Sequence, residues 1–494
     1  MINHLKLLYK HPLTLLTDLY QLTMAYGYWK SDKLHQEAVF SLFFRQAPFN
    51  GSYAIATGLN SVLEYLEDLQ FSEAELSYLT TLESEDGCPL FEQAFLDYLS
   101  ELRFTCHIDA VPEGSLIFPH EPILRVQGPL LQCQLLETAL LNIVNFQTLV
   151  ATKTTRIYRA AQGAPILEFG LRRAQGIDGA ITASRAAYIG GCAATSNVLA
   201  GKLYDIPIKG THAHSWVMSF ATEHEAFTAY ADAMPNNCVF LVDTYDTFEG
   251  VKTAINIGLQ LKKKGHTLQG IRLDSGDLLS LSQQARHLLD DAGLTEVKIV
   301  ASNDLDEYAI LKLKAAGACI DIWGIGTKLV TSYDQPALGG VYKLTAIRPN
   351  PQTDWQYRMK ISAQSVKNSN PGLLQIRRFV DSQGFLVGDL LYNQLNLPIN
   401  PKQLKPLNET TEPLNLPADT HYTDLLVPCL RYGECVCAIP SLIEIRQRVQ
   451  EQLAFCPEQY TRFDSPQPYP VYIDEYITQL KQTLMNSQAT VNEQ

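Results

Sequence analysis

The sequence has fewer basic than acidic residues, and this shortage argues against one class of partner. Its 494 residues include 39 lysines and arginines against 52 aspartates and glutamates, so the formal net charge is -13 at pH 7. A protein that binds nucleic acid needs a basic face that displaces the counterions of the phosphate backbone. We therefore expect no nucleic-acid partner, although a local basic pocket for a small anion is compatible with this composition.

Long hydrophobic runs are also lacking. The apolar stretch near the N-terminus is interrupted by Lys10, His11, Pro12 and Asp18, well short of the ~20 residues that a membrane span needs. It lacks a small-residue cleavage site, so it does not have the form of a secretory signal. We expect no membrane partner.

The ten cysteines do not form the tight framework of a secreted disulfide-rich domain. Their scattered placement predicts reduced thiols and a cytoplasmic location. The densest group, Cys429, Cys435, Cys437 and Cys456, contains no C-x-x-C pair, and this spacing does not favour a structural zinc site. Whether these four residues bind anything stays open.

No low-complexity tract interrupts the chain, and 46% of its residues are hydrophobic, as in a folded enzyme-sized protein. A chain of this length exceeds one ordinary core. Residues 1–160 mix helical and strand-like patterns and predict an α+β domain with linking helices. Residues 161–345 predict an α/β barrel that carries the catalytic site. Residues 346–494 predict a C-terminal extension that packs on the N-terminal domain.

Short β-branched runs alternate with helical stretches in the central part of the chain, which is the pattern of βα units around a parallel sheet. Six runs are visible, at 165–170, 206–211, 238–244, 270–275, 297–303 and 320–327, and each ends in polar or glycine residues. A barrel draws its chemistry from the carboxyl ends of several strands, whereas an open doubly wound sheet gathers polar residues near one switch point. We therefore favour a barrel.

These strand ends supply a set of side chains suited to handling anions. The set contains His212, His214, Asp243, Asp274, Arg172, Arg272 and the glycine-rich loop 324–327. Arginines grip carboxylate or phosphate, aspartates hold Mg²⁺ or ribose hydroxyls, and backbone N–H groups of a glycine loop hold phosphate. Each member alone is weak, because a strand-end glycine often only permits a turn and an aspartate often only caps a helix. Their convergence carries the hypothesis.

The segment GTHAHSWV, residues 210–217, allows two interpretations of its histidines. In the first, His212 and His214 bind a metal together, as in metal-dependent α/β-barrel hydrolases with His-x-His at a strand end. Such a centre needs further ligands, and the other strand ends offer carboxylates but no histidine. In the second, one imidazole is a nucleophile or proton carrier, and a carboxylate such as Asp243 fixes its tautomer. The residues favour the second interpretation.

Six long blocks follow one another in the chain: TDLYQLTMAYGYW (17–29), EFGLRRAQGIDGAITASRAAYIGG (168–191), SNVLAGKLYDIPIKGTHAHSWVMSF (196–220), LVDTYDTFEGVK (241–252), IRLDSGDL (271–278) and GIGTKLVTSYDQPALGGVYKL (324–344). Together they closely resemble the nicotinate phosphoribosyltransferase family, and the match extends from near residue 13 to about residue 390.

The resemblance implies a type II phosphoribosyltransferase, with an irregular α/β barrel beside an N-terminal α+β domain and a homodimer whose subunits share their active sites. It implies that nicotinate reacts with 5-phosphoribosyl 1-diphosphate to give nicotinate mononucleotide and diphosphate, in the salvage route of NAD biosynthesis. It also implies Mg²⁺ as cofactor and coupled ATP hydrolysis through a phosphohistidine. That residue is His214 here, and the role of His212 stays open.

The resemblance further assigns the residues that surround the substrates. The pyridine ring would stack on Phe169 and on Tyr20 of the partner subunit, while Arg172 and Arg272 would meet the nicotinate carboxylate or the phosphates. The remaining assignments are Asp274 to the ribose hydroxyls and Mg²⁺, Asp243 to His214, Thr211 to the base, and Ser302, Asn303, Gly326 and Thr327 to the 5′-phosphate. The intact acidic and basic residues speak against a non-catalytic binding protein on a decayed scaffold.

The chain contains no Walker A pattern, so ATP must use the barrel pocket. Nicotinamide is the competing base, and the related enzyme that uses it carries an aspartate after the helix that follows its Phe-Gly-x-Arg block. Residues 190–197, GGCAATSN, contain no acid. Since an aspartate would repel a carboxylate in a partly dry pocket, its absence favours nicotinate.

Overall fold

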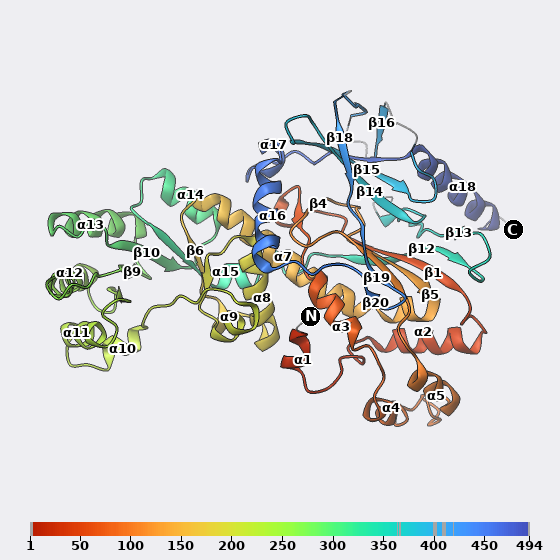
Figure 1. The fold of residues 1–494 in the computed structure, drawn as a ribbon, viewed down its shortest axis with the longest axis horizontal. Coiled ribbons are helices and arrows are strands. Elements are labelled where there is room, and N and C mark those ends of the chain that lie inside the picture. The colour runs from red at the N-terminus through yellow and green to blue at the C-terminus, as the bar shows by residue number, and fades with distance from the viewer. Residues whose placement is uncertain are drawn as a thin grey trace. The chain divides into compact units, whose positions relative to one another are not determined.

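The computed structural model describes residues 3–362, 364, 367–398, 403–407, 412–417 and 419–492. The chain forms two compact units (Figure 1). The first comprises Met1–Leu149 and Ala337–Gln494, and the second comprises Val150–Pro336. The chain therefore passes from the first unit to the second within helix α7 (Glu137–Ala161) and later returns to the first.

The second unit is built around a parallel six-stranded sheet with the strand order β7-β6-β11-β10-β9-β8. The strands are β6 (Ile166–Glu168), β7 (Ala194–Thr195), β8 (Val239–Leu241), β9 (Gly270–Leu273), β10 (Lys298–Asn303) and β11 (Ile322–Ile325). The helices are α8 (Gly176–Gly190), α9 (Val198–Tyr204), α10 (His214–Met218), α11 (Glu223–Ala233), α12 (Thr247–Lys263), α13 (Leu278–Asp291), α14 (Glu307–Ala315) and α15 (Thr327–Val330). Because the strands are parallel, the loops after them leave from one edge of the sheet.

Pairing ends at β7 on one side and at β8 on the other within the described residues, so the sheet is an open half-barrel. The irregular α/β barrel expected from the sequence is not confirmed beyond this half-barrel sheet. The strand expected over 206–211 is reduced to one bridge, between Ile208 and Thr195. Pro207 has no backbone N–H to donate, and the ladder does not extend past this bridge.

Helix α12 shows how the sequence sets the ends of a helix. The side chain of Asp246 accepts hydrogen bonds from the backbone N–H groups of Phe248 and Glu249, both at 3.0 Å, and so caps the N-terminus. At the other end the helix ends at Lys263, and Lys264 separates it from Gly265. The φ of Gly265 is 82°, which lies in the left-handed region. The helix and its glycine stop are those that the sequence predicts.

The first unit contains two larger sheets, with the orders β13-β12-β1-β5-β3-β19-β20 and β17-β16-β21-β15-β14-β18. Its strands are β1 (Glu37–Phe43), β2 (Ala54–Ile55), β3 (His107–Ala110), β4 (Leu116–Ile117), β5 (Leu124–Pro129), β12 (Val341–Arg348), β13 (Gln356–Tyr357), β14 (Leu374–Val380), β15 (Leu386–Asn393), β16 (Gln403–Pro406), β17 (Leu414–Asn415), β18 (His421–Asp424), β19 (Val427–Arg431), β20 (Glu434–Cys435) and β21 (Val471–Ile473). In addition to the first part of α7, its helices are α1 (His4–Leu8), α2 (Leu19–Lys30), α3 (Leu59–Glu67), α4 (Glu73–Leu79), α5 (Gln93–Glu101), α6 (Leu130–Leu135), α16 (Leu442–Ala454), α17 (Glu458–Thr461) and α18 (Glu475–Asn492).

The first sheet of this unit combines strands from before and after the second unit. Its strand β1 pairs with β12 on one side and with β5 on the other. In the second sheet, β14 and β15 form the hairpin that the Ser-Gln-Gly step predicts, with the backbone N–H of Gly384 donating to the carbonyl of Asp381. The segment SLIEIRQRVQEQL, residues 441–453, has the apolar spacing that predicts an amphipathic helix, and it forms α16.

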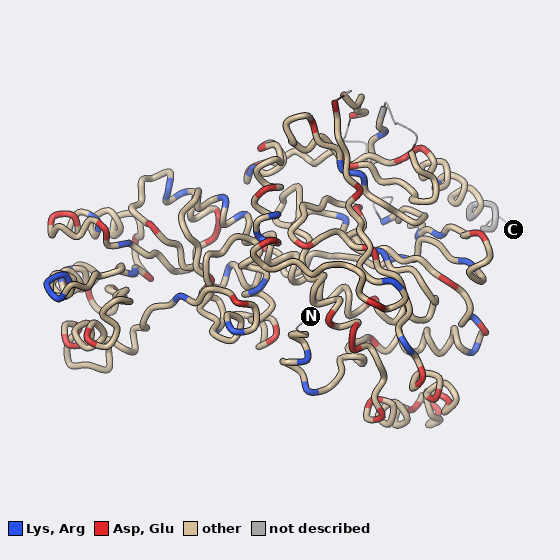
Figure 2. Tube along the Cα trace, viewed as in Figure 1, with Lys and Arg blue, Asp and Glu red and all other residues tan. Residues whose placement is uncertain are grey.

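Acidic and basic residues are intermixed along the chain in both units (Figure 2). In the part of the chain that the structure describes, no helix combines the length and the apolar character that crossing a membrane requires.

A buried ion network joins three elements of the second unit. The Lys153 ammonium of α7 is fully buried and lies 2.7 Å from Glu307 at the start of α14 and 2.5 Å from Asp334. Arg156, one turn further along α7, donates to the other carboxylate oxygen of Glu307 at 2.8 Å. Removing one partner of such a network leaves an unpaired buried charge, which is strongly destabilising.

We therefore expect Lys153→Met to lower the free energy of unfolding by about 3–5 kcal/mol, measured as a shift of the urea midpoint. The control is Lys252→Met, because Lys252 is 58% exposed and pairs with Glu249 only on the surface of α12. That variant should lose less than about 1 kcal/mol. Equal midpoints for the two variants would contradict a buried network.

Candidate active site

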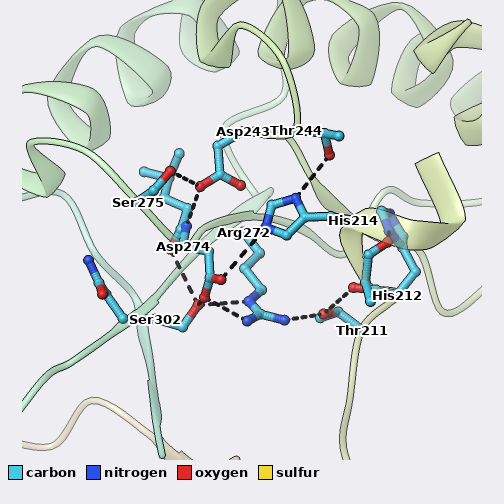
Figure 3. A network of polar contacts seen from close by, with 12 residues as sticks. Thr211, His212, His214, Asp243, Thr244, Arg272, Asp274, Ser275 and Ser302 are labelled. Carbon is cyan, nitrogen blue, oxygen red and sulfur yellow. Dashed lines mark hydrogen bonds and ion pairs between the residues drawn. The ribbon is translucent and has the colours of Figure 1, made fainter. Parts of the chain in front are cut away.

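Arg272 on β9 is the centre of a polar network at the carboxyl ends of the parallel strands (Figure 3). Its Nε donates to the Ser302 hydroxyl at 2.7 Å, and its two terminal nitrogens donate to the Thr211 hydroxyl at 3.0 Å and to Asp274 at 2.7 Å. The guanidinium also lies 5.6 Å from the centroid of the Phe169 ring. One side chain thus joins the ends of β9 and β10 to the loop before α10.

Asp274 is held as a carboxylate by this network. Burial acts to raise its pKa, but the hydrogen bond from Ser302 and the charge of Arg272 outweigh burial, so the pKa of Asp274 lies below its ordinary value. Its second oxygen lies 3.8 Å from Nε2 of His214.

His214 is the first residue of α10, and its side chain is 40% exposed. Its Nδ1 lies 3.1 Å from the Thr244 hydroxyl, which follows β8. The sequence suggests Asp243 as the carboxylate beside this imidazole, but in the structure the polar groups nearest its two nitrogens are Thr244 and Asp274 (Figure 3). No sequence pattern singles out Thr244, because its contact depends on the packing of α10 against the end of β8.

Asp243 lies one step further from His214. Its Oδ2 accepts the backbone N–H of Asp274 at 2.9 Å and the hydroxyl of Ser275 at 2.6 Å, so it fixes the turn after β9. Its Oδ1 is buried without a hydrogen-bond partner among the described residues, and so is Oε1 of Glu223. Burial, followed by the charges of Asp243 and Asp246, raises the pKa of Glu223 to about 7.

The two histidines of the 210–217 segment do not share a metal. His212 is 8% exposed, and its Nε2 accepts the backbone N–H of Leu241 at 3.2 Å. Figure 3 shows its ring apart from the carboxylates that surround His214. Among the residues that the structure describes, no group of three histidine, cysteine or acidic side chains is arranged to hold a metal ion. Because the backbone contact occupies Nε2 of His212, the geometry does not favour the metal-hydrolase interpretation.

Phe169 follows β6 and packs against Gly324 of the neighbouring β11. A Cβ on Gly324 would come within 2.8 Å of the Phe169 ring, so only glycine leaves room for the ring there. Asn303 at the end of β10 is paired with Ile325 and adopts a φ of 143°, a strained conformation for this residue type. Gly326 and Thr327 come directly after Ile325, so the expected phosphate residues lie side by side.

Glu168 is a site residue that no motif predicts. It is fully buried at the end of β6, and its carboxylate accepts hydrogen bonds from the Ser184 hydroxyl at 2.9 Å and the Thr195 hydroxyl at 2.5 Å, and from the Gly170 backbone N–H. These bonds tie α8 and β7 to the turn that presents Phe169. The only signal in the sequence is an acidic residue at the end of an otherwise apolar strand.

Comparison with known proteins decides the family. Residues 15–145 match the nicotinate phosphoribosyltransferase N-terminal domain, residues 165–382 the nicotinate phosphoribosyltransferase family, and residues 374–481 the C-terminal domain. The nicotinate phosphoribosyltransferase of Bacillus subtilis is 44% identical over 469 residues, which cover 94% of this chain and 93% of that protein. The chain belongs to the nicotinate phosphoribosyltransferase family, a family of enzymes.

Comparison with human nicotinate phosphoribosyltransferase supports the same family. The human nicotinate phosphoribosyltransferase is 36% identical, with 96% of this chain and 97% of that protein covered. The crystal structure of human nicotinic acid phosphoribosyltransferase has a TM-score of 0.81 at 33% identity and covers 95% of this chain and 99% of that one. The mixed α/β fold and the identification made from the sequence are thereby confirmed.

Two further residues that the resemblance assigns to the substrates of a nicotinate phosphoribosyltransferase are not among the contacts of Arg272 in the described residues. Arg172 is exposed in the short 3₁₀ turn Leu171–Arg173 and is not part of the Arg272 network. Tyr20 belongs to the first unit, where it is 47% exposed on α2 beside the exposed Leu19 and Met24.

The first unit also holds a group of cations that no motif predicts. Burial, together with the charges of Lys481 and Arg45, lowers the pKa of His120 to about 4. Burial lowers the pKa of Lys343 as well, and the positive charges of Lys360 and Arg45 act in the same direction. Nε of Arg45 is buried without a hydrogen-bond partner in the described part of the chain. Because these residues come from distant segments, only the fold brings their charges together.

The raised pKa of Glu223 predicts how stability depends on pH. Unfolded, this carboxyl loses its proton near 4.5, whereas in the folded protein it keeps the proton up to about pH 7. The stability that Glu223 contributes is therefore present below pH 4.5 and is lost as the pH rises to 7. The melting temperature of Glu223→Gln relative to the unsubstituted protein should thus be higher at pH 8 than at pH 4.

Glu225→Gln is the matched control, since Glu225 is an exposed carboxylate in the same first turn of α11. Its difference in melting temperature should stay nearly constant over the same range. A difference for Glu223→Gln that is equally constant would contradict the raised pKa.

Proposed function

We propose that this chain joins nicotinate to 5-phosphoribosyl 1-diphosphate, giving nicotinate mononucleotide and diphosphate, and couples this reaction to ATP hydrolysis through a phosphohistidine at His214. The observation that carries the ATP coupling is the position of His214. Its imidazole is 40% exposed, has Thr244 beside one nitrogen, and faces Asp274 with the other. The half-barrel sheet supports the irregular barrel of type II phosphoribosyltransferases.

The phosphoryl step uses the lone pair of one imidazole nitrogen. When Nδ1–H of His214 donates a hydrogen bond to the Thr244 hydroxyl, Nε2 carries no proton. The lone pair of Nε2 can then attack the γ-phosphorus of ATP. The N–P bond forms as the bond to ADP breaks, and the leaving oxygen stays on ADP. Asp274 lies 3.8 Å from Nε2 and suits the orientation of the ring. Phosphorylation can favour donor binding only if the two forms of the site differ in affinity for the donor.

The glycosyl step needs positioning rather than an acid or a base. Displacement at the anomeric carbon passes through an oxocarbenium-like state, while the pyridine nitrogen waits in line. A pyridine stacked on Phe169 gains ~1 kcal/mol beyond its burial. The guanidinium of Arg272 lies 5.6 Å from the centroid of the Phe169 ring. Its positive charge there suits the carboxylate of nicotinate rather than the neutral amide of nicotinamide.

Mg²⁺ is the expected cofactor, and the site has the groups that it prefers. The ion usually binds proteins through one or two carboxylates and takes its other ligands from substrate phosphates and water. Asp274 would hold it, and Asp243 offers a buried Oδ1 that has no hydrogen-bond partner among the described residues. When bound, Mg²⁺ neutralises the charge of the leaving diphosphate.

The homodimer with shared active sites is also a proposal. Tyr20, Leu19 and Met24 leave an apolar face of α2 exposed, while Ile177 and Val198 of the second unit are 77% and 69% exposed. Covering both faces between subunits would bring Tyr20 of the partner subunit toward Phe169. The cations near Arg45, of which Lys343 lies 4.0 Å from Glu137, suit a polyphosphate.

The cytoplasmic location stays a prediction from cysteine usage. All ten cysteines are free in the structure, and six of them are buried. Buried reduced thiols suit a reducing compartment.

His214→Ala should form no labelled protein when it is incubated with γ-labelled ATP and Mg²⁺, because the phosphoryl acceptor is missing. It should retain a slow, ATP-independent formation of nicotinate mononucleotide, since Phe169 and Arg272 are untouched. The measurement is product formation from labelled nicotinate with and without ATP, together with acid-labile label on the protein.

His287→Ala is the control, because His287 is 77% exposed on α13 and pairs only with Asp291. It should behave as the unsubstituted enzyme does. ATP stimulation that persists in His214→Ala would contradict the phosphohistidine, and equal use of nicotinamide by the unsubstituted enzyme would contradict the choice of base.

Shared active sites predict complementation between two inactive variants. Tyr20→Ala and His214→Ala damage opposite sides of each site, so each homodimer should have low ATP-stimulated activity. After the two are mixed and allowed to exchange subunits, half of the sites in a hybrid dimer carry neither change, and activity should return. Activity that stays at the sum of the separate variants, although exchange is detected, would contradict a site shared between subunits.

A further inference from the structure

The imidazole of His212 is enclosed by three aromatic rings of the second unit. Its centroid lies 5.0 Å from that of Tyr230 and 5.9 Å from that of Phe227, both on α11, and 6.2 Å from that of Phe240 on β8. The residue is 8% exposed. An apolar residue would fill this space equally well, so packing alone does not explain a histidine here.

Both nitrogens of His212 have backbone partners. Nε2 accepts the N–H of Leu241 at 3.2 Å, and Nδ1 lies 3.4 Å from the carbonyl oxygen of Ala213, to which it can donate. A nitrogen that accepts an N–H carries no proton, so the ring is the neutral Nδ1–H tautomer. Burial, with smaller effects of Arg272 and His214, outweighs the Ala213 contact and lowers the pKa of His212, which agrees with a neutral ring.

The two partners of the ring belong to the two segments that form the phosphorylation site. Ala213 immediately precedes His214, and Leu241 is the last residue of β8, just before Asp243 and Thr244. Leu241 lies on an edge strand, because β8 has β9 as its only neighbour in the described sheet. The N–H of Leu241 therefore points to the open edge, where His212 supplies its acceptor.

We infer that His212 is a positioning residue that clamps the loop 210–213 to the edge of β8 and thereby sets the approach of His214 to Thr244 and Asp274. This inference rests on the proposed phosphorylation of His214. The clamp acts on the imidazole more directly than on the base pocket. Phe169 is presented by β6, which three strands separate from β8, and Thr211 of the same loop is held by its own hydrogen bond to Arg272. His212 thus affects the ATP-dependent part of the reaction.

Three substitutions separate positioning from packing. His212→Phe keeps an aromatic ring in the aromatic enclosure but removes the acceptor for Leu241. His212→Gln places an amide oxygen within reach of the same N–H and so restores the acceptor. Phe227→Leu trims the same enclosure, because Phe227 stacks on Phe240 at 4.4 Å, but leaves both contacts of His212 in place.

We expect His212→Phe to lower the rate of label transfer from γ-labelled ATP to the protein about tenfold, as the loss of one hydrogen bond and an unpaired buried N–H allows. His212→Gln should recover most of this rate. The KM for nicotinate without ATP should change by less than about twofold in both variants. Phe227→Leu should lower the melting temperature yet keep label transfer. His212→Met, which also lacks the acceptor geometry, is measured alongside in case the phenyl ring does not fit.

Two outcomes would overturn the inference alone. In the first, the unsubstituted enzyme is labelled, and His212→Phe or His212→Met is labelled at the same rate per folded molecule. In the second, Phe227→Leu and His212→Phe lose labelling in proportion to their loss of stability, and His212→Gln gives no recovery. An unsubstituted enzyme that forms nicotinate mononucleotide but takes no label would instead overturn the phosphohistidine itself.

Discussion

The guanidinium of Arg272 is the group on which the site depends. Its three hydrogen bonds reach Ser302, Thr211 and Asp274, which come from β10, from the loop before α10 and from the turn after β9. A lysine could not satisfy this arrangement, because its single ammonium has no fixed planar fork. The pairing of β9 between β8 and β10 places the residue between two neighbouring strand ends. From there the same charge holds Asp274 ionised and faces the ring of Phe169.

Near this centre, residues of the same chemical type differ in exposure and in protonation because their surroundings differ. His214 is exposed at the start of a helix, whereas His212, two residues earlier, is enclosed by aromatic rings and bonded to the backbone. Asp274 is ionised beside Arg272, whereas Glu223, buried near other carboxylates, keeps its proton to about pH 7. In each pair the side-chain chemistry is alike, and burial and neighbouring charges separate the roles.

Much of the fold follows from local signals. The cap at Asp246 and the glycine at 265 bound α12, and the turn before Phe385 bounds the hairpin, because caps and turns involve only neighbouring residues. The run 206–211 is β-branched as well, yet it forms a single bridge, since pairing depends on a partner strand that no local pattern reveals. Barrel closure is the same kind of question, and the described sheet ends at β7 and β8.

The sequence by itself determined the family, five of the six strands of the parallel sheet and the placing of Arg272, Asp274 and Ser302 at strand ends, because motif spacing and parallel pairing are readable from residue types. Only the tertiary structure decided that Thr244 and Asp274, rather than Asp243, contact His214, that His212 is part of the core, and that Glu168 holds the Phe169 turn. The reason is physical. Which side chain meets which across a site depends on ångström-scale packing of elements distant in sequence, and a residue type does not carry that information.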